Sequence, residues 1–176
     1  ILRRTERRDV QMNENELAGL LESLKRMGSD DFSVEVKESA TTLSRDVWET
    51  VSAFANTAGG IIVLGVSERA GFVPVANFET EKVLNQFVAG MGDAGGRGKL
   101  ANPPKYTIER VELQGTVVLV ITIEELDPSS KPCYVIERGA QGGSYKRIDD
   151  KDVPLSSTEV LSLASYERTS PSDRDT

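Results

Sequence analysis

The stretch from residue 44 to residue 66 constrains the fold more than any other part of the chain. An apolar stripe at helical spacing predicts a helix that follows Ser44. Asn56–Gly60, with the sequence Asn-Thr-Ala-Gly-Gly, is typical of a helix end followed by a turn. The apolar run Ile61–Val66 comes next and is typical of a strand buried on both faces of a sheet. A helix that leads straight into a buried strand predicts a layered α/β structure.

Similar patterns predict the other elements. We expect further helices over 13–28 and 79–91 and after a capping box at Ser156–Glu159, and strands over 32–36, 105–113, 116–124, 133–137 and 144–148. No internal repeat is visible, so the chain of 176 residues predicts one mixed α/β (α+β) domain, with a mixed sheet packed against helices. We expect a basic N-terminal arm and helix over 1–28, the folded domain over 29–165, and a disordered tail over 166–176.

Composition excludes several classes of site. The chain has no histidine, so a Ser-His-Asp triad, a Cys-His pair and a classical zinc finger are excluded. A single cysteine, Cys133, excludes an internal disulfide and favours a cytoplasmic location. No apolar run approaches the length of a membrane span, so we expect no membrane partner. The first residue is Ile1 rather than Met, which leaves open whether the chain is a piece of a longer protein.

The net charge argues against tight binding to a long duplex by bulk attraction. There are 28 Asp and Glu against 21 Lys and Arg, a formal charge of −7. Proteins that hold duplexes in this way usually carry a basic surplus. A local basic patch stays compatible with the sequence.

Glu35 and Lys37 lie two residues apart on the first predicted strand, so alternation puts them on one face. A Glu-x-Lys pair of this kind occurs in metal-dependent nucleases, where carboxylates hold a divalent cation and lysine stabilises developing negative charge. The alternative interpretation is an ordinary salt bridge on a solvated face.

Two glycine-containing turns invite a phosphate-binding interpretation. In Asn56–Gly60, the side chains of Asn56 and Thr57 and the exposed amides could contact a phosphate, or the glycines could simply allow a tight connection. Gly92–Lys99 fails the phosphate-loop pattern, because Asp93 and Leu100 stand where that motif needs Gly and Ser or Thr. We expect a solvated loop there, from which Arg97 and Lys99 could reach a backbone phosphate.

A late strand carries Tyr145, Lys146 and Arg147, and Lys131 precedes it. Tyr145 and Arg147 share one face, which suits one stacked base and one phosphate contact. The alternative is an edge strand whose charges prevent aggregation.

Several of these segments together resemble the Schlafen AlbA-like domain family over about residues 29–165. The resemblance rests on Ser33–Ser39, Val51–Gly60, Ile61–Val66, Lys131–Tyr134 and Ser144–Arg147, in that order. It implies a nucleic-acid-binding module of a cytoplasmic bacterial regulator. Phosphate contacts are then expected from Lys37, Lys131, Lys146, Arg147 and the N-terminal arginines.

Some Schlafen proteins are endoribonucleases that cut structured RNA such as tRNA, and the resemblance allows that alternative as well. It would assign Asp30, Glu35 and Glu68 as ligands of Mg²⁺ or Mn²⁺, with Lys37 as stabiliser. Asp30 is shorter than the usual Glu, and Ser67-Glu68 stands where Asp is more usual. The ribonucleases join two lobes into a clamp, so a homodimer would be needed here.

The sequence therefore leaves open whether the chain is an enzyme and whether it binds DNA or RNA. A third alternative is a protein-interaction or oligomerisation domain that has lost its nucleic-acid surface.

Overall fold

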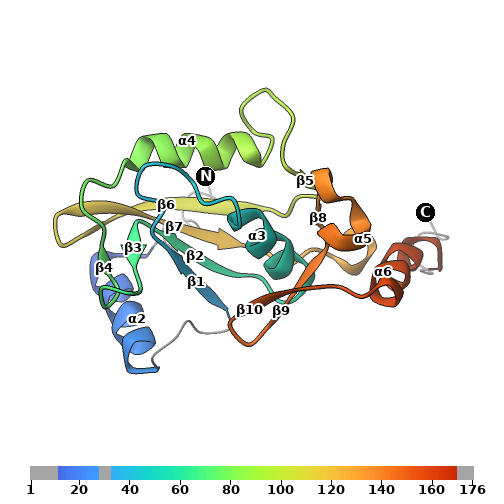
Figure 1. The fold of residues 1–176 in the computed structure, drawn as a ribbon, viewed down its shortest axis with the longest axis horizontal. Helices are drawn as coiled ribbons and strands as arrows, with labels where there is room; N and C mark the ends of the chain where they lie inside the picture. The colour runs from blue at the N-terminus through green and yellow to red at the C-terminus, as the bar shows by residue number, and fades with distance from the viewer. Residues whose placement is uncertain (1–11, 28–32, 170–176) are drawn as a thin grey trace, which may run out of the picture.

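The computed structural model describes residues 12–27 and 33–169 of the chain. Figure 1 shows a central sheet of four strands with helices on both faces. Residues 1–11, 28–32 and 170–176, and with them the N-terminal arm and Asp30, lie outside the described part.

The central sheet is mixed and has the strand order β1-β2-β7-β6. Its strands are β1 (Val34–Lys37), β2 (Gly60–Leu64), β6 (Tyr106–Leu113) and β7 (Thr116–Ile123). β1 pairs with β2 in parallel, and the other two pairings are antiparallel. The expected mixed α/β class is confirmed.

Three helices cover the sheet. α2 (Glu14–Met27) packs on one face through Leu17, Leu21 and Leu24. α3 (Val47–Asn56) and α4 (Thr80–Gly90) belong to the larger cluster on the opposite face, which is built around Phe54 and Phe87. The two faces follow from strand alternation, since Val63 packs toward α2 whereas Ile62 and Leu64 pack toward α3.

Short elements surround the sheet, and Figure 1 places the C-terminal ones on one side of α3. They are β3 (Val66–Ser67), β4 (Val73–Pro74), β5 (Leu100–Ala101), η1 (Pro128–Ser130), β8 (Tyr134–Val135), η2 (Ile136–Arg138), α5 (Ala140–Gly143), β9 (Tyr145–Ile148), β10 (Lys151–Pro154) and α6 (Ser157–Thr169). α6 begins at the expected capping box, in which Ser156 and Glu159 exchange two hydrogen bonds. The tail boundary expected at 166 falls inside this helix.

The apolar run at 61–66 forms two strands rather than one. Gly65 has a φ of +97°, and a Cβ there would lie 2.7 Å from the Phe78 ring, so the chain bends where only glycine fits. β2 therefore ends at Leu64, and β3 pairs with β4 outside the central sheet.

None of the helices in the described part of the chain combines the length and the hydropathy needed to cross a bilayer.

Candidate nucleic-acid interface

Arg147 lies at the centre of a buried ionic cluster. Its guanidinium donates from Nη1 to Glu35 Oε1 at 2.9 Å and to Asp152 Oδ1 at 2.7 Å. The side chain is only 3% exposed, and those of Glu35 and Asp152 are 15% and 16% exposed. Thr50 donates to the second oxygen of Asp152 at 2.6 Å, which attaches the cluster to α3.

The strands position this cluster. Alternation along β9 turns Arg147 inward, and the β9–β10 pairing places Asp152 directly opposite it. On β1, Glu35 points to the α3 side of the sheet, as alternation predicts. The Arg147 guanidinium also lies 5.0 Å from the centre of the Phe54 ring. Burial lowers the pKa of Arg147, but the two carboxylates outweigh burial and raise this pKa above its ordinary value.

The three lysines of the sequence prediction are each paired with a carboxylate. Lys37 lies 3.1 Å from Asp46, and its side chain is 11% exposed. Lys131 lies 2.7 Å from Glu125 and Lys146 lies 2.8 Å from Glu159. These partners neutralise much of the charge that the lysines would offer to a phosphate.

Asn56 and Thr57 bind the protein's own backbone. The Asn56 amide donates to the carbonyls of Cys133 and Tyr145, each at 2.9 Å, and accepts from the Cys133 N–H at 2.8 Å. Thr57 accepts from the backbone N–H of Arg147 at 2.9 Å. The end of α3 thus holds β8 and β9, which favours the tight-connection interpretation of this turn.

The glycines of the same turn fit that interpretation. Gly59 has a φ of +72°, and a Cβ on it would lie 2.7 Å from the carbonyl oxygen of Ile123. Tyr145, expected to stack on a base, is 6% exposed, and its hydroxyl accepts a hydrogen bond from Arg138.

The described carboxylates do not fit a divalent metal ion. Glu35 is held by Arg147, whereas Glu68 is exposed in the turn between β3 and β4. Within residues 12–27 and 33–169, no three His, Cys, Asp or Glu side chains gather closely enough to hold a metal. Asp30, the third predicted ligand, lies outside the described residues, so the ribonuclease assignment stays a prediction.

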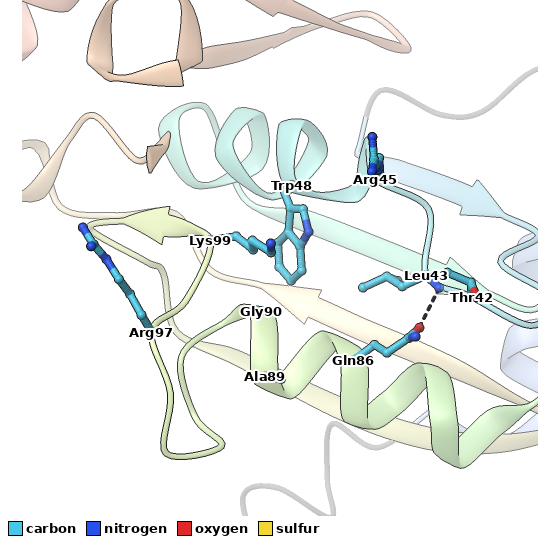
Figure 2. Close-up of a pocket in the computed structure, with 9 residues that line it drawn as sticks. All are labelled: Thr42, Leu43, Arg45, Trp48, Gln86, Ala89, Gly90, Arg97 and Lys99. Atoms are coloured by element: carbon cyan, nitrogen blue, oxygen red, sulfur yellow. Dashed lines mark hydrogen bonds between the residues drawn. The ribbon is translucent and has the colours of Figure 1, made fainter. Parts of the chain in front are cut away.

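A different set of cations lines a groove beside α3, which we call the basic groove. It is formed by Arg45, Arg97, Lys99 and Arg138, and Trp48 lies in its wall. Its volume is about 900 Å³. Figure 2 shows Arg45 and Arg97 on either side of Trp48, with Lys99 reaching toward the indole ring.

Backbone hydrogen bonds fix the walls of this groove. The N–H of Lys99 donates to the Gly90 carbonyl at 2.6 Å, so the loop that follows α4 returns to the helix end. The Lys99 carbonyl accepts from the N–H of Ile136 at 3.0 Å, next to the β5–β8 pairing. These bonds bring Lys99 close to η2, which carries Arg138, and Arg45 approaches from the segment before α3.

The groove keeps a positive surplus in an acidic protein. Arg45, Arg97 and Lys99 are exposed, and none has a carboxylate within 4 Å in the described part of the chain. Arg138 pairs with Glu49 at 2.9 Å, and Glu137 is the other acid in the lining. Four cations against two carboxylates make this groove attractive to an anion.

The sequence profile of the family described as "Schlafen, AlbA_2" matches residues 30–156. The chain belongs to this family. The resemblance noted from Ser33–Ser39 and the later segments is thereby confirmed.

Among solved structures, this Schlafen, AlbA_2 chain is similar to the N-terminal domain of a Nitrosomonas europaea protein related to RecG, whose name refers to ATP-dependent DNA helicases. The TM-score is 0.56 with 28% identity, over 76% of this chain and 89% of the other. A second similar structure is the DIP2311 protein of Corynebacterium diphtheriae. Here the TM-score is 0.49 with 15% identity, over 87% of this chain and 29% of the other. No protein of curated function matches the chain at a significant level.

The sequence gives only a weak indication of the groove of this Schlafen, AlbA_2 domain. The glycine-rich segment predicts a solvated loop from which Arg97 and Lys99 could reach a phosphate, and the structure places both side chains in the groove lining. Arg45 and Arg138 were missed. Their only signal was positive charge in segments without periodic pattern, and only the fold brings those segments together.

Proposed function

We propose that the chain binds the phosphate backbone of DNA or RNA in the basic groove. The observation that carries the proposal is the gathering of Arg45, Arg97 and Lys99 without carboxylate partners, in a protein whose formal charge is −7. The less exposed Lys37, Lys131 and Lys146 each have a carboxylate within 4 Å, unlike these three cations. A cluster that escapes neutralisation is therefore suited to an external anion.

The similarity to a RecG-related protein supports a nucleic acid as the anion that binds in the basic groove. The RecG-related protein is named after DNA helicases, and its N-terminal domain has the same fold as this chain. In this proposal the chain is the nucleic-acid-binding module of a cytoplasmic regulator, as the Schlafen AlbA-like resemblance implies. A homodimer that extends the groove remains a prediction of the same resemblance.

The number of cations sets the expected salt dependence. Three or four phosphate contacts predict that log affinity falls with log salt with a slope of about −3 for duplex DNA, and about −2 to −3 for a single strand. Fluorescence anisotropy with labelled oligonucleotides at several salt concentrations measures this slope.

A paired substitution tests the groove itself. Replacing Arg97 and Lys99 together by alanine removes two contacts, so the slope should become shallower by about 2 and binding should weaken for every sequence. The matched control replaces Lys131 and Lys146, which are paired with acids, and we expect its affinity to stay close to that of the wild type. Arg69→Ala is a second control, because this cation is 89% exposed and lies in the β3–β4 turn.

Two results would contradict the proposal. One is the absence of binding to DNA and RNA at low salt. The other is an equal loss of affinity in the groove variant and in the Lys131 and Lys146 control, which would place the contacts elsewhere on the surface.

A further inference from the structure

A smaller pocket opens at the Trp48 end of the basic groove and carries hydrogen-bond donors without a single acid. It shares Arg45, Trp48, Arg97 and Lys99 with the groove and has a volume of about 390 Å³. Its remaining lining consists of Thr42, Leu43, Gln86, Ala89 and Gly90. We call it the donor pocket, because the groove's two carboxylates, Glu49 and Glu137, do not line it.

The indole N–H of Trp48 is a hydrogen-bond donor in this pocket for which the described residues supply no acceptor. Trp48 is 9% exposed, and its ring stacks on Phe87 at a centroid distance of 5.4 Å. Within the described residues its Nε1–H has no hydrogen-bond partner. In Figure 2 this nitrogen lies on the ring edge turned toward Leu43 and Arg45. A buried donor without an acceptor is costly, so a ligand acceptor there would be stabilising.

Gln86 supplies further donors. Its Oε1 accepts from the backbone N–H of Leu43 at 2.8 Å, drawn as the dashed line in Figure 2. This bond fixes the orientation of the amide, so the NH₂ group faces away from Leu43 and has no partner within the described residues. The same bond joins the segment before α3 to α4 and closes the pocket on the side opposite the groove.

We propose that the donor pocket binds a phosphate monoester, namely the terminal phosphate of a strand lying in the basic groove or that of a free nucleotide. This inference rests on the proposed nucleic-acid binding and adds the ligand group at one end of the groove. A monoester carries close to two negative charges at neutral pH and offers three acceptor oxygens, whereas a backbone diester carries one charge. Arginine and lysine donors with neutral N–H groups suit that dianion. The volume has room for the phosphate and part of its nucleoside.

The end chemistry of a short oligonucleotide tests the proposal. Three probes share one sequence and carry a 5′-phosphate, a 3′-phosphate or a hydroxyl at both ends. The nucleoside monophosphate is added as a competitor. We expect one phosphorylated end, or the mononucleotide, to bind about tenfold more tightly than the hydroxyl probe, the effect of one or two charge-assisted hydrogen bonds.

Gln86→Glu separates the pocket from the groove. The carboxylate can still accept from the Leu43 N–H, but it replaces the free donors with negative charge, so the end preference should disappear while binding of the hydroxyl probe falls much less. Gln114→Glu is the matched control, because it makes the same change in the β6–β7 turn, which does not line the pocket. Trp48→Phe removes the N–H and keeps an aromatic ring, and its thermal midpoint shows whether it folds.

The outcomes distinguish this inference about the donor pocket from the proposed nucleic-acid binding in the basic groove. A preference for a strand end identifies the strand as the source, and competition by the mononucleotide without an end preference identifies a free nucleotide. Salt-dependent binding with no preference for any phosphate monoester overturns this inference and leaves the proposed function standing. Absence of binding by every probe overturns both.

Discussion

Replacing Arg147 with methionine removes the cation that lies between Glu35 and Asp152. Both carboxylates bond to the same Nη1 atom and are largely buried. Without that atom, the two negative charges would face each other with no cation between them. Two charges about 5 Å apart repel by about 3 kcal/mol at an effective dielectric constant of about 20. Breaking buried ion pairs by removing one partner typically costs about 3–5 kcal/mol, and we expect that loss of unfolding free energy for Arg147→Met.

Denaturant unfolding followed by the fluorescence of Trp48, the only tryptophan, measures this loss. In thermal unfolding the midpoint should fall by roughly 6–20 °C, at about 2–4 °C per kcal/mol for a chain of this size. Arg69→Met is the control for an exposed arginine, and its effect should stay within about 0.5 kcal/mol.

A triple variant tests the electrostatic cause. Arg147→Met combined with Glu35→Gln and Asp152→Asn leaves no buried charge in the cluster, so its stability should return most of the way to that of the wild type. The reasoning is refuted if Arg147→Met unfolds at the wild-type midpoint, or if the triple variant is less stable than the single one.

Two further predictions concern titrating groups. Cys133 is fully buried, and burial raises the pKa of its thiol to about 12, so a thiol reagent at pH 8 should react only as fast as the protein opens. Rapid labelling without denaturant would contradict this. The hydrogen bond from Lys146, aided by those from Ser156, lowers the pKa of Glu159 from 4.5 to about 2. Its stabilising effect should therefore be complete above pH 4.5 and be lost as the pH falls toward 2, so the difference in thermal midpoint between wild type and Glu159→Gln should shrink over that interval. A constant difference would show that this carboxylate is not involved.

The larger elements could be predicted because their patterns are local. The stripe of leucines at 17, 21 and 24 and the alternation at Val34 and Val36 give α2 and β1 without knowledge of the fold. The strand β10 could not be found in this way, since Lys151–Pro154 is polar and short. Because β10 is not predicted, the position of Asp152 opposite Arg147 is not predicted either. The ion pair that explains the burial of Arg147 is therefore missing from the sequence prediction.

The site depended on contacts between distant segments. Alternation predicts the faces of β1 and β9 that carry Glu35 and Arg147, but sequence cannot show that these two faces meet and bury Arg147, for which a phosphate contact was expected. The pairing of β5 with β8 involves two residues in each strand, too few for any periodic signal. That pairing brings the glycine-rich loop to η2 and so creates the basic groove.

The bond between the Lys99 N–H and the Gly90 carbonyl returns the chain to the end of α4 and leaves only the tip of the intervening loop outside the packed structure. Met91 and Asp93 are held by the core and by Tyr106, whereas side chains added at Gly95 or Gly96 would project into open space. We therefore expect that residues can be inserted or deleted at Gly95 and Gly96 while the neighbouring helix and strand keep their places. Such a change alters how far Arg97 extends from the fold. The tip of this loop is therefore the place at which replacement of the loop sequence would change ligand preference.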